Sequence, residues 1–455
     1  MGTKEIAEFV LETHYRNVPK EAIHLAKRAI LDYLGVAIAG SGEPVTTILS
    51  QYVKQMCTVA EAGVIGGRFK TSAELAAWIN GTIGHALDYD DTDSIAAGYN
   101  MHPSVPILPA VFAMGEKCGI SGEEILTAYI IGFEVEARIG SAIGSQNSEA
   151  GWHPTSVVGT VAATVASAKI LKLNPIETQR ALGVAGSITG GLMYNFGTMT
   201  KPMHAGNAAR NGVIAARLAK RGFTANENIM DGKFGFCSLF SGSKISEIGD
   251  KDQDLGSVWN IITIGFAFKP YPSCRDTHAS VDATLQLRKT LNITVDQVES
   301  IICKVNPRQS QNLRFPKPRN GNEAKFSMQY CIGTALFKGE LTLDDFKDEV
   351  VIDSPVIDLL PKISLVHPKG STSESDPAQE VLIKLKNGKE YSYKVTEPKG
   401  DPKNPMTDEE LLAKFRDCTK PTLKASDIEK VIELILDLEE LEDITKLTEI
   451  VTNLA

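Results

Sequence analysis

Apolar residues repeat with two different periods along this chain, and the change between them near residue 265 constrains the fold more than any other feature. Before that point the apolar residues recur at helical spacing, as in Ala26, Ala29, Ile30, Tyr33 and Leu34. After it they alternate with polar residues over 381–385 and again over 391–395, on either side of Asn387-Gly388, which is a hairpin signal. We therefore expect a mainly α-helical chain that carries an α+β part.

The length of the chain predicts two domains. At 455 residues it exceeds the roughly 250 to 300 residues at which a single hydrophobic core stops growing. The Pro- and Gly-rich stretch 397–405 reads as a linker that leads back to helix. We expect a large all-helical domain built from both chain ends, residues 1–265 and 402–455, and a smaller α+β lid domain over residues 266–401.

Local signals place several elements. Small residues crowd 156–169 and 205–219, which predicts central helices whose backbones approach closely. In the α+β part we expect strands over 298–306 and 363–367 and helices over 277–288 and 324–337. Four capping boxes predict helix starts, at Ser121–Glu124, Asn174–Glu177, Thr407–Glu410 and Ser426–Glu429.

Composition excludes several classes of function. A formal net charge of −9 argues against a nucleic-acid partner, which would need a basic stripe. The polar N-terminus and the lack of an apolar run near 18 residues predict a cytoplasmic protein with no membrane partner. Seven cysteines form no C-x-x-C pair, so neither a zinc knuckle nor a disulfide framework is indicated.

Five of the eight histidines lie in Gly-, Pro- or Asp-rich junctions between predicted helices, where side chains reach a cleft more easily than from a helix interior. They are His85, His102, His153, His204 and His278. A single junction histidine is more often structural than catalytic, but the shared context of the five favours a site.

The segment from His85 to Pro103 is the centre of the predicted site. Its first nine residues, HALDYDDTD, hold four carboxylates and one histidine. That density is costly unless a metal, a basic side chain or histidines face it. The segment does not match an EF-hand, which requires a Gly at position six together with a Glu at position twelve. A Mg²⁺ site and a solvated loop of helix-capping aspartates remain alternatives.

Two further loops, 198–204 (TMTKPMH) and 268–278 (FKPYPSCRDTH), each combine cations and a histidine with proline. Cations that are held in place before binding recognise a carboxylate with a smaller loss of entropy. No dinucleotide, phosphate-loop, nucleophile-elbow or H-E-x-x-H pattern is present. These loops therefore predict a small anionic substrate.

With these segments in view, the chain resembles the MmgE/PrpD family, which includes 2-methylcitrate dehydratase, cis-aconitate decarboxylase and iminodisuccinate epimerase. The resemblance covers nearly the full length, and its most specific carriers are GHALDYDDT (84–92), MHPS (101–104), GWHPTSVVG (151–159), GTMTKPMHAGNAA (197–209) and KPYPSC (269–274). It implies a helical domain with an α+β lid, a homodimer, no organic cofactor and a small polycarboxylate substrate.

The resemblance also implies roles for individual residues. His102 and His153 would be the acid and base, Asp88 would orient one of them, and Lys201 and Lys269 would hold carboxylates and stabilise an enolate-like charge. The expected substrate-binding residues are Thr92, Met199, His204, Cys274, Arg275, His278 and Tyr330. No residue is assigned to a metal.

The expected reaction is that of a cofactor-independent lyase, a dehydratase or decarboxylase of a citrate- or aconitate-like acid. An isomerase or epimerase and a non-catalytic scaffold on the same fold are the alternatives. The GTMTKP segment (197–202) is more similar to the decarboxylase and epimerase branches than to the dehydratase branch. The stretch between Thr92 and His102 is longer than in the decarboxylase, which implies a pocket of different shape.

Overall fold

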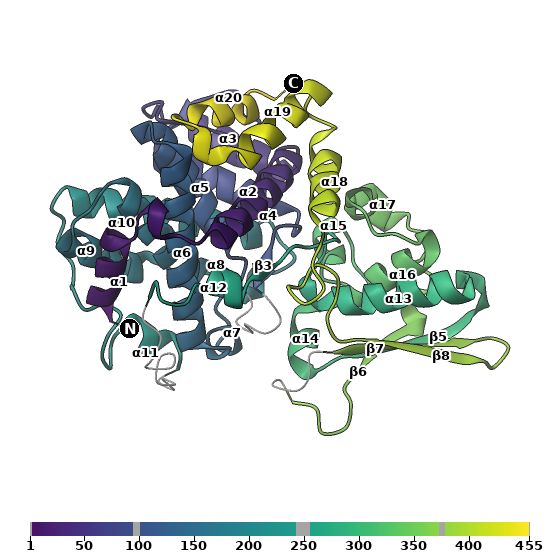
Figure 1. Ribbon diagram of the computed structural model, residues 1–455. Coiled ribbons are helices and arrows are strands. Elements are labelled where there is room, and N and C mark those ends of the chain that lie inside the picture. Colours follow the sequence, from purple (N-terminus) through teal and green to yellow (C-terminus); the bar gives the residue numbers. More distant parts are fainter. Residues whose placement is uncertain (1, 94–100, 243–254, 373–377, 455) are drawn as a thin grey trace.

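The computed structural model describes residues 2–93, 101–242, 255–372 and 378–454. Helices dominate the first 265 residues, and they form one group in space (Figure 1). These helices are α1 (Thr3–Glu12), α2 (Lys20–Gly40), α3 (Pro44–Lys54), α4 (Ala73–Ala86), α5 (Ser104–Cys118), α6 (Gly122–Ile143), α7 (Gln146–Glu149), α8 (Pro154–Ile170), α9 (Pro175–Ile188), α10 (Thr200–Lys220), α11 (Phe236–Phe240) and α12 (Asn260–Thr263). No helix of the described residues has the length and apolar character to span a bilayer.

The helices of the C-terminal end join this group, as the sequence predicts. They are α18 (Asp408–Thr419), α19 (Ala425–Leu436) and α20 (Thr445–Thr452). Leu411 and Phe415 of α18 are buried in the same hydrophobic core as Ile30 and Leu34 of α2. Figure 1 shows α18 to α20 lying over the helical group beside α2 and α3. Both chain ends therefore build one helical unit.

The α+β part has its own core around a four-stranded sheet. The strands are β5 (Val298–Lys304), β6 (Ile363–Val366), β7 (Gln379–Leu385) and β8 (Glu390–Val395), in the order β6-β5-β7-β8. β5 pairs with β6 in parallel and with β7 antiparallel, and β7 and β8 form the predicted hairpin. The helices of this part are α13 (His278–Leu291), α14 (Pro307–Asn312), α15 (Gly321–Ala324), α16 (Met328–Lys338) and α17 (Asp348–Ile352). The chain is thus mainly α with an α+β part.

Four two-residue strands complete the fold of the described residues, and they pair segments that lie apart in the sequence. They are β1 (Ala62–Gly63), β2 (Lys70–Thr71), β3 (Thr92–Asp93) and β4 (Phe266–Ala267). β3 pairs antiparallel with β4, so Thr92 lies opposite Ala267. This pairing joins the acidic segment that follows α4 to the start of the Lys269 loop.

Helix starts follow the sequence signals with two exceptions. The capping boxes at Ser121, Asn174 and Thr407 are confirmed. The box at Ser426 is wrong, because α19 already begins after Lys424, whose carbonyl accepts from the amides of residues 427 and 428. The carboxylate of Glu429 pairs with the exposed Arg416 instead, with contacts of 2.7 and 2.8 Å.

The second exception is the helix predicted over 324–337. The side chain of Ser327 accepts a hydrogen bond from the backbone N–H of Tyr330, which starts α16 at Met328. Ala324 is the last residue of α15, and Lys325 and Phe326 lie between the two helices. The interruption matters for the site, because Phe326 lines the cavity described next.

Candidate active site

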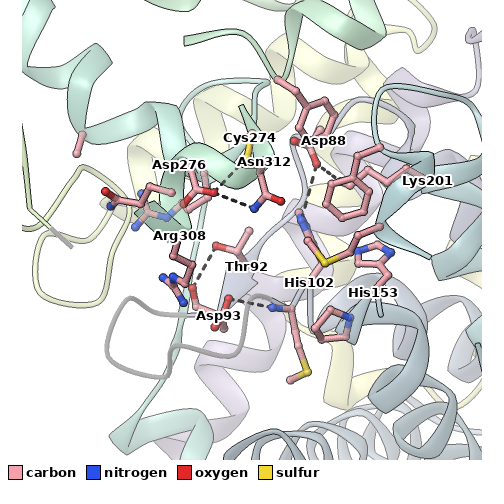
Figure 2. A pocket seen from close by; sticks show the side chains of 18 of the residues that line it. Asp88, Thr92, Asp93, His102, His153, Lys201, Cys274, Asp276, Arg308 and Asn312 are labelled. Carbon is pink, nitrogen blue, oxygen red and sulfur yellow. Dashed lines mark hydrogen bonds and ion pairs between the residues drawn. The ribbon is translucent and has the colours of Figure 1, made fainter. Parts of the chain in front are cut away.

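A cavity of about 90 Å³ lies where the helical group meets the α+β part. Figure 2 shows side chains from both parts pointing into it. The helical side supplies Asp88 from the turn after α4, Thr92 from β3, His102 just before α5, His153 at the start of α8 and Lys201 from α10. The α+β side supplies Cys274, Arg275, Asp276, Arg308, Asn312 and Gln379. Residues far apart in the sequence thus share one polar chamber.

The carboxylate of Asp88 is held between two ammonium groups. Oδ1 contacts Nζ of Lys201, and Oδ2 lies 3.3 Å from Nζ of Lys269, which also donates a 2.8 Å hydrogen bond to the Asp88 carbonyl. Burial alone would raise the pKa of the Asp88 carboxyl, but the two lysines outweigh burial and hold it well below its usual range. Asp88 is therefore ionised.

Lys201 is further fixed by aromatic rings. Its Nζ lies 5.4 Å from the ring centroid of Phe196 and 5.2 Å from that of Phe326, which permits cation–π contacts with both. Lys269 is completely buried, and burial lowers the pKa of its ammonium group, while the Asp88 carboxylate opposes that shift. A lysine with reduced hydration and few available rotamers suits the clamping of an anion.

Two histidines converge on the carboxylate of Asp90. Nδ1 of His85 donates to Asp90 at 2.9 and 3.0 Å, and Nδ1 of His102 lies 2.9 Å from Asp90 Oδ2. Nε2 of His102 lies 3.7 Å from Asp88 Oδ1. Burial lowers the pKa of His102 to about 3, so the ring is neutral at physiological pH. The carboxylate that contacts Nδ1 of His102 is thus Asp90, whereas Asp88 faces Nε2.

His153 forms a second imidazole pair with His204, and its ring centroid lies 5.9 Å from that of His85. It occupies the N-cap position of α8, with Pro154 as the first helical residue. Its Nδ1 lies 3.1 Å from Nδ1 of His204, so one of these nitrogens donates and the other accepts. Burial lowers the pKa of His153 well below its usual value and that of His204 to about 4. Both rings are therefore neutral at physiological pH.

The α+β wall carries buried polar atoms that have no partner among the described residues. Nη2 of Arg275 lies 3.3 Å from Asp401, but Nε and Nη1 have no hydrogen-bond partner among the described residues. Asn312 donates from Nδ2 to Asp276 at 3.0 Å, and its Oδ1 has no partner there either. Unpaired buried donors and acceptors are costly, so these atoms mark a place for a polar ligand.

The predicted site residues separate into three groups. Seven line the cavity: Asp88, Thr92, His102, His153, Lys201, Cys274 and Arg275. Two lie directly behind it, Lys269 against Asp88 and His204 against His153. Three do not reach it: Met199, His278 and Tyr330.

Each of these three side chains has another environment. Met199 is 39% exposed and borders a separate surface groove. His278 is buried, with Nε2 at 3.1 Å from the Ser273 carbonyl. The hydroxyl of Tyr330 donates to the Asp345 carbonyl inside the α+β core.

Sequence reasoning missed residues that the cavity does use. Arg308 and Asn312 come from α14, whose start is marked by a capping box from Asn306 to Gln309, and Gln379 is the first residue of β7. Only the three-dimensional fold brings the three side chains together. Phe196 belongs to no motif, and its only signal is its position two residues before the loop 198–204. The contact of Asp90 with two histidines also had no signal, because the spacing alone makes all four aspartates of the segment equivalent.

The other aspartates of the acidic segment serve the backbone. Asp91 accepts from the backbone N–H of Ser104 at 3.2 Å and so caps the start of α5, and burial raises its pKa well above the usual range. Asp93 accepts from the backbone N–H of Met101 at 3.1 Å. The capping that the sequence predicts is thus found for Asp91. Residues 94–100 of the predicted segment lie outside the described residues.

One group in this region has the composition of a metal site. His85, Asp88, Asp90 and His102 each offer a ligand atom, and these atoms lie within 4.8 Å of one another. The two ammonium groups already take the Asp88 oxygens, and two imidazole nitrogens already contact Asp90. A divalent ion would have to displace lysines that it also repels. The donor set therefore does not fit a divalent cation.

The fold and the cavity together define a two-part, mainly helical protein with histidines and lysines around one polar chamber. Family models cover most of it: residues 4–248 match the MmgE/PrpD N-terminal domain and residues 271–440 match the MmgE/PrpD C-terminal domain. The chain belongs to the MmgE/PrpD family.

Curated relatives are similar over almost the whole chain. A cis-aconitate decarboxylase of Mus musculus is 32% identical over 94% of this chain and 88% of that protein. The cis-aconitate decarboxylase of Homo sapiens is 31% identical over 94% of this chain and 89% of that protein. A mitochondrial 2-methylcitrate dehydratase of Yarrowia lipolytica is 24% identical over 82% of this chain and 73% of that protein.

Proposed function

We propose that this protein is a cofactor-independent lyase that removes carbon dioxide from a small tricarboxylate of the cis-aconitate kind. The observation that carries the proposal is the cavity, in which two neutral imidazoles, His102 and His153, lie with Lys201. The relatives named cis-aconitate decarboxylase favour decarboxylation over dehydration, because their identity and coverage exceed those of the dehydratase.

Substrate binding uses opposite walls of the cavity. Lys201, backed by Lys269, attracts the carboxylate next to the reacting carbon and stabilises the charge that develops there. Nε and Nη1 of Arg275 donate to a second carboxylate at the α+β wall. A polycarboxylate satisfies the donors of both walls, which a monocarboxylate cannot do.

The chemical step then needs one proton. The bond to the leaving carboxylate breaks, and its electron pair stays on the substrate, delocalised toward the carboxylate that Lys201 holds. Carbon dioxide leaves, and His102 or His153, in its protonated form, delivers its proton to the carbon; the ring regains a proton from solvent, so the net reaction consumes one proton and releases one carbon dioxide. Burial lowers the pKa of both histidines and so limits the fraction of imidazolium at neutral pH, and groups that stabilise the protonated ring therefore favour this delivery.

Proton transfer without bond cleavage is the second candidate function. Two imidazoles in one cavity permit removal of a proton by one ring and its return by the other, which is the chemistry of an isomerase or epimerase. The same groups serve both reactions, so the substrate decides between them.

Incubation in deuterated water distinguishes the reactions. With cis-aconitate, we expect the loss of carbon dioxide and one deuterium in the product, read by NMR and mass spectrometry. Loss of water from a citrate-like acid would indicate a dehydratase, and deuterium uptake without loss of mass would indicate an isomerase. Lack of turnover with a panel of C4 to C7 polycarboxylates would contradict the proposal.

A matched pair of histidine variants tests the site. We expect His153→Ala to reduce kcat by about 10²- to 10⁴-fold, the range for loss of a general acid or base. His24→Ala should retain full activity, because the His24 side chain is 55% exposed and far from the cavity lining. Equal activity of the two variants would remove His153 from the mechanism.

The homodimer and the cytoplasmic location stay predictions.

A further inference from the structure

The carboxylate of Asp90 takes no part in the steps proposed above, although it is buried directly behind them. Its side chain is 1% exposed and does not line the cavity. Its oxygens contact Nδ1 of His85 at 2.9 and 3.0 Å, and Oδ2 also lies 2.9 Å from Nδ1 of His102. Two imidazoles therefore converge on one carboxylate.

An ionised carboxylate offers only lone pairs, so it stabilises a proton on a ring nitrogen 2.9 Å away, although the contact of His102 Nδ1 departs from the direction of a regular hydrogen bond. The two nearby rings lower the pKa of the Asp90 carboxyl well below its usual value, against the opposing effect of burial. With its proton on Nδ1, a neutral His102 keeps its lone pair on Nε2. His102 lines the cavity, so Nε2 is the nitrogen available for proton transfer. His85 is completely buried and has no such access.

The charges around His102 give Asp90 a second effect. Lys201 of α10 and the Lys269 loop bring two positive charges, and Asp88 and Asp90 bring two negative charges. The neighbouring rings of His85 and His153 are neutral. Without Asp90 the surroundings of His102 would carry one net positive charge, which disfavours an imidazolium.

We propose that Asp90 is a positioning residue that fixes the tautomer of His102 and stabilises its protonated form, with His85 as the second donor that holds the carboxylate in place. A buried aspartate has this relation to the histidine of a serine-protease triad. The size of the kinetic effect rests on the proposed function, whereas the tautomer does not.

Asp90→Asn and Asp91→Asn form a matched pair of variants. Both remove one buried carboxyl group at neighbouring positions, but Asp91 caps α5 and contacts no histidine. We expect Asp90→Asn to lower kcat on the order of 10²- to 10⁴-fold, with KM changed much less, and the acid limb of its pH profile to move to lower pH. Asp91→Asn should stay within about threefold of the parent, because an amide resembles the protonated acid there.

Two results would overturn the proposal. The first is an equal loss of kcat in both variants while circular dichroism shows both folded. The second needs no substrate: it is ¹⁵N NMR of histidine-labelled parent protein, with His102 assigned by its absence in folded His102→Gln. We expect the His102 proton on Nδ1, and a proton on Nε2 would overturn the proposal. A parent protein that is inactive on every acid but has the Nδ1 tautomer would contradict the proposed function and retain this inference.

Discussion

At the scale of single residues, the site depends on how buried charges are matched. Asp88 is ionised because two lysines face it, and His102 is neutral because burial outweighs its aspartate neighbours. Arg275 is matched only in part, since its pair with Asp401 leaves Nε and Nη1 without partners among the described residues. The incomplete pairing makes Arg275 the residue whose role is most directly tested by substitution.

We expect Arg275→Gln to raise KM for a tricarboxylate by about 10- to 100-fold, the value of one charge-assisted hydrogen bond, with a smaller effect on kcat. The control is Asp401→Asn, which removes the ion pair but keeps the guanidinium. Steady-state kinetics with a tricarboxylate and a dicarboxylate distinguish the two roles. If both variants raise KM equally, Arg275 acts through Asp401 and does not bind substrate.

Residue types and motif spacing predict which side chains lie near the cavity, but they do not predict which side chain each one contacts. Seven of the twelve expected site residues line the cavity. The sequence could not distinguish Asp88 from Asp90, because both follow the end of α4 closely and neither belongs to a pattern that the other lacks. Asp88 adopts a left-handed backbone conformation with φ of 52°, which turns successive carboxylates to different partners, and no pattern of apolar residues encodes that turn.

At the scale of elements, the position of Lys269 depends on two crossings of the chain. One leads from the helical group to the α+β part near Phe268, and the other leads back near Gly400. The backbone N–H of Phe268 donates to the Gly400 carbonyl at 3.1 Å, and the next residue along is Lys269. The stretch 397–405 leads from β8 back to helix α18, as the sequence predicts, and it is also tied to the opposite crossing. A Cβ on Gly400 would lie 1.8 Å from the Phe268 carbonyl oxygen, so only glycine permits this approach.

We expect Gly400→Ala to lower both the thermal midpoint and kcat, because the clash displaces Phe268 and with it Lys269. Gly388→Ala is the matched control: its φ of 82° is similar to the 91° of Gly400, but nothing lies within 4 Å of its added Cβ in the hairpin turn. The control should lose about 1–2 kcal/mol from backbone strain and keep its kcat. Equal kcat in the two variants would show that the crossing does not position Lys269.

Elements with strong local signals could be predicted from the sequence, and those set by tertiary contacts could not. The capping boxes at Ser121, Asn174 and Thr407 and the Asn387-Gly388 hairpin depend on neighbouring residues alone. The break before α16 has a local cause, the cap of Ser327 on the backbone N–H of Tyr330, which is a weaker signal than a capping box, whereas the side chain of Glu429 pairs with Arg416 of α18. A pattern of adjacent residues contains no information about such partners.

At the scale of the whole molecule, buried titratable groups make stability depend on pH in two opposite senses. Burial lowers the pKa of His204 to about 4, so below pH 6.5 the unfolded chain binds protons that the folded chain does not, and stability is lost as pH falls from 6.5 to about 4. Glu136 of α6 has the opposite effect, because it lowers stability as pH rises. Burial and the nearby Asp91 and Asp93 raise its pKa well above the usual value.

Glu136 is completely buried, and neither of its carboxylate oxygens has a hydrogen-bond partner among the described residues. Above pH 4.5 the unfolded chain ionises this group while the folded chain keeps it protonated, so its cost to stability grows with pH until the folded pKa is reached. Gln has the shape of the protonated acid and no proton to lose. Glu136→Gln should therefore stabilise the protein, by up to about 1.4 kcal/mol more for each pH unit above 4.5.

Urea denaturation of both proteins from pH 4.5 to 8 measures this difference. The midpoint of Glu136→Gln should match that of the parent near pH 4.5 and exceed it progressively toward pH 8, while kcat stays unchanged because Glu136 does not line the cavity. His204→Gln provides the opposite slope, since its difference from the parent should change between pH 4 and 6.5 and stay constant above that range. A pH-independent difference for Glu136→Gln would mean that the carboxylate is ionised in the folded protein. A cation would then have to reach it within the helical core.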